Sequence, residues 1–355
     1  MNLARPVAVA LTLAVVAVLT GCAGAVPAVT SQSASSSPTP SATPTHAAAP
    51  TLRVPTTCDD LVPPAALQSS LRLAVHSVDL TPSRTPAGYA DKRAGVLTCR
   101  WESAERFGST ATVSVWITVV PDATAEAVED DRAGSFGGGT AQRIDGVAES
   151  FQACEPGFFQ FCGFEALSGH YGISGGIWDY GTPTFASQSG ALRELIARTI
   201  PTVGALAAAT PLWQPSGATL RGATDCDGML TIPQIVAATG WPGAHASKSD
   251  GGENALSTLE VNAQVGSYWC AITADDNSDS LFISVLPGGA SFATSTRPAD
   301  ATAVSDVGDS GYRTADTLDV VAAEGWIQVA NSGKLDDGQV AALAKQLLVN
   351  VGYTG

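Results

Sequence analysis

Apolar and polar residues alternate in two well-separated parts of this chain. Apolar residues recur at every second position from Val113 to Val119 and again from Leu281 to Val285. Successive side chains of a strand point to opposite faces of the sheet, so each run predicts a strand with one buried face. Period-2 strands without regularly alternating crossover helices argue against a doubly wound parallel sheet.

A helical spacing of apolar residues follows each of these regions. The spacing predicts two amphipathic closing helices, with apolar positions at Leu192, Leu195, Ile196 and Thr199, and at Val340, Leu343, Ala344 and Leu347. One shorter helix is predicted near the beginning of each half, at Pro64–Leu71 and at Pro233–Thr239.

These elements belong to an internal duplication. Cys58-Asp59-Asp60-Leu61-Val62 is echoed by Cys226-Asp227-Gly228-Met229-Leu230, and Ile144–Ser150 is echoed by Val304–Ser310. The shared order predicts two homologous α+β domains, each a twisted antiparallel sheet packed with helices. The first repeat is assigned to residues 56–209 and the second to 224–355. A linker with two prolines and two glycines, 210–223, separates them.

The N-terminus has the pattern of a bacterial lipoprotein signal peptide, residues 1–21. Arg5 supplies the early positive charge, and Val7–Leu19 is uniformly Ala, Val, Leu and Thr. A helix of that length would reach about 20 Å, short of a hydrocarbon core of about 30 Å. The run ends in Leu19-Thr20-Gly21-Cys22, a lipobox that predicts acylation of Cys22. An ordinary secretory signal or a short membrane anchor are the alternatives.

Residues 22–55 are predicted to be a lipidated cysteine followed by a disordered tether. The segment is rich in Ser, Thr, Pro and Ala and shows no apolar periodicity, so it cannot bury a core. The expected location is the extracytoplasmic face of the cell membrane, with the chain held there by its N-terminal lipid.

Seven cysteines occur in the chain, and lipidation of Cys22 would leave six. An even set in an exported protein predicts disulfides. The duplication favours one bridge within each repeat, Cys58 with Cys99 and Cys226 with Cys270. Cys154 and Cys162 then close a small loop that the second repeat lacks.

The charge balance excludes a nucleic-acid partner. The chain has 18 basic and 33 acidic residues, a formal charge of −15, and only four lysines, which form no cluster. Nothing here provides the basic surface that phosphate backbones require.

Together, the lipobox, the tether, the Cys-Asp-x-Leu segments, the tryptophans beside Cys99 and Cys270, and Val307-Gly308-Asp309 resemble actinobacterial cell-envelope lipoproteins of the DUF3558 family. The resemblance implies two tandem DUF3558-like repeats with a compact α+β fold, and it supplies no catalytic residues. The first repeat departs from the pattern at Val147-Ala148-Glu149 and carries the extra disulfide loop.

One segment formally matches the nucleophile elbow of α/β-hydrolases, Gly172-Ile173-Ser174-Gly175-Gly176. An elbow must join a strand to a helix, yet the residues that follow do not predict a helix, and His245 is the only downstream histidine. An envelope hydrolase is therefore the least favoured function, and we expect no catalytic site.

Three further patterns predict no cofactor or metal site. Asp275–Asp279 has alternating oxygens but lacks the later residues of a calcium loop, so a hairpin turn is the better interpretation. Gly134–Gly139 lacks the Lys-Ser/Thr of a phosphate loop. The histidines at 46, 76, 170 and 245 have no metal-ligand spacing.

Aromatic residues are concentrated between Phe151 and Tyr180, and most are expected to pack the core. Phe158 and Phe159 lie at the tip of the small disulfide loop and could instead contact a partner. The favoured function is a lipid-anchored extracytoplasmic binding or sensing protein, with a protein, small-molecule or lipid ligand that the sequence does not identify. A structural or assembly partner of a membrane complex is the alternative.

Overall fold

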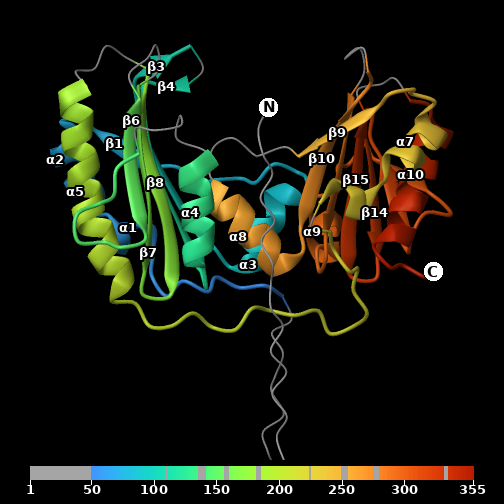
Figure 1. Ribbon diagram of the computed structural model, residues 1–355, viewed down its shortest axis with the longest axis horizontal. Coiled ribbons are helices and arrows are strands. Elements are labelled where there is room, and N and C mark those ends of the chain that lie inside the picture. The colour runs from blue at the N-terminus through green and yellow to red at the C-terminus, as the bar shows by residue number, and fades with distance from the viewer. Residues whose placement is uncertain are drawn as a thin grey trace, which may run out of the picture. The chain divides into compact units, whose positions relative to one another are not determined.

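The computed structural model describes residues 49–108, 110–134, 141–155, 160–180, 185–223, 225–248, 255–275, 280–331 and 335–355. Within these ranges two antiparallel sheets of six and seven strands carry the fold (Figure 1). The predicted α+β class, with a sheet and its helices in each repeat, is confirmed.

The first sheet has the order β1 (Val75–Ser77), β2 (Leu97–Ser103), β5 (Val113–Pro121), β8 (Tyr171–Asp179), β7 (Gln160–Ser168) and β6 (Ser150–Glu155). The second has the order β12 (Thr302–Val304), β13 (Ser310–Arg313), β14 (Thr317–Ala322), β15 (Gly325–Asn331), β11 (Ser280–Leu286), β10 (Tyr268–Thr273) and β9 (His245–Lys248). A small separate pair joins β3 (Arg106–Phe107) to β4 (Thr110–Ala111).

The central strands of the two sheets correspond position by position. Cys99 of β2 lies opposite Ile117 of β5, and Cys270 of β10 lies opposite Ile283 of β11. The next neighbour of β5 is β8, and the next neighbour of β11 is β15. The alternating apolar residues of β5 and β11 are buried, as the sequence predicts.

Helices from the beginning and end of each repeat cover one face of its sheet. They are α1 (Cys58–Leu61), α2 (Pro64–Leu71) and α5 (Phe185–Gly204) on the first sheet, and α6 (Cys226–Met229), α7 (Ile232–Thr239) and α10 (Asp337–Asn350) on the second (Figure 1). All eight apolar positions predicted for the two closing helices are buried. Because each helix turns its apolar stripe to the sheet, this face is the core of its repeat.

Further helices lie between the two sheets (Figure 1). They are η1 (Ala87–Tyr89), α3 (Ala90–Ala94), α4 (Ala125–Gly134), α8 (Ala255–Val265) and α9 (Ala290–Ser295). Helix α8 of the second repeat packs on β5 and β8 of the first sheet. In the opposite direction, Tyr89 of the first repeat packs on Phe292 and Trp326 of the second, with ring centroids 5.0 and 5.9 Å apart. Residues 45–355 accordingly form one compact unit.

The packed chain begins before residue 56, where the sequence placed the first repeat. Arg53 and Val54, assigned to the tether, are 4% and 1% exposed. Arg53 donates to the carbonyl oxygens of Thr210 and Ala94, 2.7 and 3.2 Å away. The tether boundary at 55 was therefore placed too late, because local composition does not reveal partners so distant in sequence.

The three disulfides are those expected from the repeats. Cys58 joins Cys99, Cys226 joins Cys270, and Cys154 joins Cys162. The first two link the opening helix of a repeat to a central strand of its sheet, whereas the third joins directly opposed residues of β6 and β7. Between the repeats, residues 205–223 contain no helix or strand.

Candidate ligand-binding site

A segment of the first repeat, Ser83–Gly88, crosses the second sheet on the face opposite α10. Its anchor is Arg84, whose Nη1 and Nη2 lie 3.0 and 2.9 Å from Oδ2 of Asp319 on β14. The Asp319 side chain is completely buried, and the Arg84 side chain is 24% exposed. A buried carboxylate requires such a partner, so this ion pair fixes the position of the segment.

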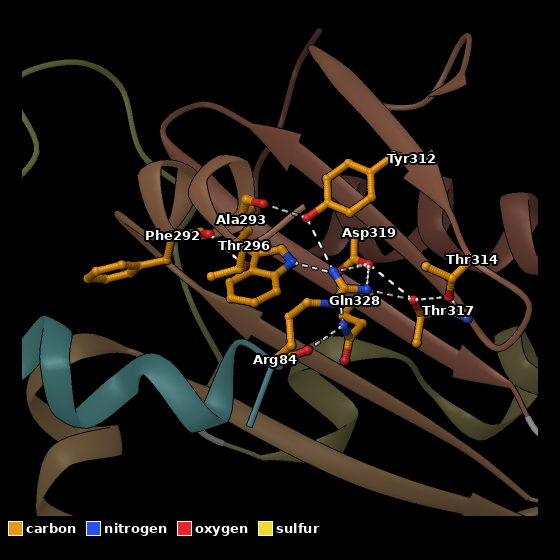
Figure 2. A network of polar contacts seen from close by, with 10 residues as sticks. Arg84, Phe292, Ala293, Thr296, Tyr312, Thr314, Thr317, Asp319 and Gln328 are labelled. Atoms are coloured by element: carbon orange, nitrogen blue, oxygen red, sulfur yellow. Dashed lines mark hydrogen bonds and ion pairs between the residues drawn. The ribbon is translucent and has the colours of Figure 1, made fainter. Parts of the chain in front are cut away.

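Three neighbours complete the environment of Asp319, and Figure 2 labels two of them, Thr317 and Gln328. Trp326 Nε1 and Gln328 Nε2 each donate to Oδ1 at 2.8 Å, and the Thr317 hydroxyl donates to Oδ2 at 3.1 Å. Together with the two hydrogen bonds from Arg84, the carboxylate accepts five hydrogen bonds, so no acceptor position is left for a further donor. Asp319 is thus a structural anchor and not a candidate general base.

Gln328 gives the segment a second attachment. Its Nε2 also donates to the backbone oxygen of Arg84 at 3.0 Å, so both of its amide hydrogens are used (Figure 2). The side chain and the backbone of Arg84 are therefore both tied to the sheet.

Tyr312 lies beside this network and is also held by the fold. Its hydroxyl donates to the Ala293 oxygen at 2.7 Å (Figure 2), and the guanidinium groups of Arg84 and Arg297 lie 5.6 and 5.3 Å from its ring. Burial, aided by the nearby Asp319 charge, raises the pKa of Tyr312 to about 12. The phenol is therefore neutral at physiological pH and acts here as a hydrogen-bond donor.

The anchored segment and the sheet line an open cavity of about 410 Å³. The sheet contributes five lining residues, Trp269, Phe282, Ser284, Gln328 and Ala330, and the segment contributes Ser83, Thr85, Ala87 and Gly88. Trp269 and Phe282 form its aromatic wall, with ring centroids 5.6 Å apart, and Phe282 is 42% exposed. None of the described residues that line it is charged. A mostly apolar cavity with a few hydroxyl and amide groups suits a small uncharged ligand.

The corresponding face of the first sheet has a smaller hollow of about 150 Å³. Its lining residues are Leu80, Thr98, Arg100, Ser114, Trp116, Trp178 and Tyr180. By strand register, Trp116 takes the place of Phe282, and Thr98 takes the place of Trp269. The duplication therefore gives two hollows on equivalent faces with different linings.

The aromatic residues expected in the core divide into two groups. Phe151, Phe164 and Tyr171 are completely buried. Phe161, Trp178 and Tyr180 are partly exposed, and the two last-named line the smaller hollow.

Cys22, Phe158 and Phe159 lie outside the described residues, so acylation and the partner-contact site stay predictions. Also outside are His46, the glycine-rich residues 135–140 and the acidic residues 276–279. In the portion of the chain that the structure describes, no helix is both long and apolar enough to cross a membrane.

The hydrolase-like motif has the wrong local structure for a nucleophile elbow. Ser174 lies in the middle of strand β8 and is 4% exposed, and the strand runs unbroken from Tyr171 to Asp179. His245 lies on β9, in the other sheet. Over the described ranges, no group of three or more His, Cys, Asp or Glu side chains is arranged to hold a metal ion.

Sequence reasoning missed Arg84, Asp319 and the cavity wall around Trp269 and Phe282. One signal was present, because Asp319 is a single charged residue in the otherwise apolar run Leu318–Ala322. A lone charge inside a strand pattern indicates a buried partner, but it does not say which one.

Comparisons with known proteins do not assign the chain to a family. No protein-family model matches the chain, and no curated protein matches it. Among solved structures, the di-domain ARO/CYC StfQ from the steffimycin biosynthetic pathway aligns over 85% of this chain and 90% of its own. The identity is 10% and the TM-score 0.14, so the alignment supports no inference.

Proposed function

We propose that the chain is a lipid-anchored extracytoplasmic binding protein, and that the cavity between Ser83–Gly88 and the second sheet holds its ligand. The observation that carries the proposal is this cavity of about 410 Å³, whose aromatic wall carries no charge. Pockets of such size and lining are typical of small-molecule sites. The ligand is therefore proposed to be small, uncharged and largely apolar.

The proposed location rests on the sequence alone, through the lipobox that ends at Cys22. A binding role is favoured over an enzymatic one because Ser174 is embedded in a strand and Asp319 is saturated with hydrogen bonds. The assembly-partner alternative would require a surface contact, and it would not require a cavity.

Binding of N-phenyl-1-naphthylamine, an uncharged fluorescent probe, tests the proposal. The mature chain from Ala23, made without its lipid, should bind the probe with an increase in fluorescence. Ala330→Trp, which places an indole in the cavity, should remove most of this binding. Ser114→Trp, the matched change in the hollow of the first sheet, should leave it unchanged.

Two results would contradict the proposal. One is the absence of a saturable fluorescence increase, and the other is equal binding by Ala330→Trp and the unmodified chain. Circular dichroism of each variant shows whether the fold is retained.

A further inference from the structure

The smaller hollow, on the first sheet, has a floor of aromatic rings. Trp116 lies directly over Gly176, since a Cβ atom built on that glycine would come within 2.3 Å of the indole. The ring is nearly parallel to that of Phe161, with an interplanar angle of 13° and centroids 5.5 Å apart. Glycine at position 176 thus permits the indole to lie flat on the sheet.

The floor extends to Trp178 and Tyr180. Trp178 is 4.6 Å from Phe161 between ring centroids, and Tyr180 is stacked on it at an interplanar angle of 16°. Trp116, Trp178 and Tyr180 all line the hollow and are partly exposed. Three adjoining rings therefore present part of their surface to whatever occupies the hollow.

Polar groups surround this floor. Strand register places Arg100 directly opposite Trp116, and Ser114 directly opposite Trp178. Thr98 and Leu80 complete the wall. Arg100 lies 3.0 Å from Glu102, which also pairs with Arg106. Hydrogen-bonding groups thus lie beside an aromatic surface, and the guanidinium that an anion would contact already has a carboxylate partner.

We propose that this hollow binds a single ring of a neutral saccharide. A pyranose has an apolar face of C–H bonds, which suits the rings, and hydroxyls at its edge, which suit Thr98, Arg100 and Ser114. An acyl chain would leave the polar groups without partners. The site is separate from the cavity of the second sheet.

The test is binding of the mature chain from Ala23 to an array of neutral oligosaccharides that contain hexoses, pentoses and N-acetylhexosamines. A positive saccharide is then titrated in solution by calorimetry. We expect Trp116→Ala to weaken this binding about tenfold or more, and Trp116→Phe to retain most of it.

Trp269→Ala removes a partly exposed tryptophan from the equivalent face of the second sheet and serves as the matched control. It should leave saccharide binding unchanged while it weakens N-phenyl-1-naphthylamine binding. The proposal for each site can therefore be contradicted independently of the other. Ser114→Ala changes the rim without touching a ring and should also weaken saccharide binding.

The proposal is overturned if no saccharide on the array binds, or if Trp116→Ala binds as tightly as the unmodified chain. Binding of free indole that Trp116→Ala abolishes, with no saccharide bound, would assign the hollow to planar aromatic ligands instead. Thermal midpoints of all variants show whether a loss reflects the site or the fold.

Discussion

Asp319 illustrates how one side chain can hold two distant parts of the chain together. Its carboxylate is buried in the second sheet, while Arg84, its charged partner, is 235 residues away in the first repeat. Burying a carboxylate is unfavourable unless it is paired and hydrogen-bonded. The position of the cavity wall therefore depends on this ion pair together with the hydrogen bond from Gln328 to the Arg84 backbone oxygen.

Replacing Arg84 with Ala should lower the free energy of unfolding by about 3 kcal/mol, because it leaves a buried charge without its partner. Urea unfolding monitored by circular dichroism measures the change. Arg132→Ala, which removes an exposed ion pair with Glu129, is the matched control and should leave the free energy of unfolding nearly unchanged. Equal effects of the two variants would show that the Arg84 pair does not anchor the segment.

Asp91 on α3 should make stability depend on pH. Burial of its carboxylate raises the pKa from 3.8 to about 6. The folded state then binds the proton more tightly than the unfolded state, so the free energy of unfolding should fall as pH rises from about 4 to about 6.

Asp91→Asn should remove this dependence. At pH 7.5 the variant should be more stable than the unmodified chain by about 1–2 kcal/mol, a value reduced because the side chain is partly exposed. At pH 3.5 the two proteins should have similar stability. Denaturant titrations of both proteins across this pH range measure the free energy of unfolding. If it varies with pH in the same way in both, Asp91 does not cause the pH dependence.

At the scale of elements, the strands and terminal helices could be predicted because each has one buried face. Helix α2 has the predicted bounds, and α7 begins at Ile232, one residue before the predicted start. Helix α8 was not predicted, because it packs between two sheets and has no simple apolar stripe. Its buried residues include apolar Val261 and charged Glu260 side by side, and Glu260 accepts hydrogen bonds from Thr124 of the other repeat.

The binding cavity, like helix α8, could be predicted only where a local apolar pattern determines it. Strand periodicity predicts which face of β11 is buried, but not that Ser83–Gly88 covers the opposite face. That contact depends on a pairing across most of the chain, which no local pattern encodes.

The three disulfides should contribute unequally to stability. Chain-entropy arguments assign about 4 kcal/mol to each of the bridges that span 41 and 44 residues, and about 2.5 kcal/mol to the one that spans 8. Replacing Cys226 and Cys270 together with Ser should therefore cost about 1.5 kcal/mol more than replacing Cys154 and Cys162. Urea midpoints of the two double variants provide the comparison. The reverse order would mean that the small loop contributes more to the native state than its length suggests.

At the scale of the whole molecule, the lipobox predicts that Cys22 attaches the chain to the membrane. Cys22→Ala should release the protein into the medium or leave it unprocessed, because the acyl acceptor is lost. Metabolic labelling with a fatty acid measures this directly. Labelling that persists in Cys22→Ala would exclude Cys22 as the acylated residue.

The two repeats should unfold together although their sequences describe two similar units. Thr124 donates twice to Glu260 of α8, at 3.2 and 3.1 Å, and Gln264 of the same helix donates to the Pro121 oxygen at 2.7 Å. These contacts lie between the sheets beside the apolar residues of η1, α3 and α8, so separation would expose apolar surface and unpaired polar groups together.

We therefore expect one calorimetric transition, with equal calorimetric and van't Hoff enthalpies. Cleavage at a protease site introduced at residues 214–219, within the segment that lacks helix and strand, should leave the two fragments associated on gel filtration. Residues 224–355 expressed alone should not reach the stability of the same fragment in the cleaved complex, because α8 then lacks the first sheet. Two separate transitions, or fragments that elute apart while folded, would show that each repeat is stable by itself and that the packing of α8 on the first sheet contributes little.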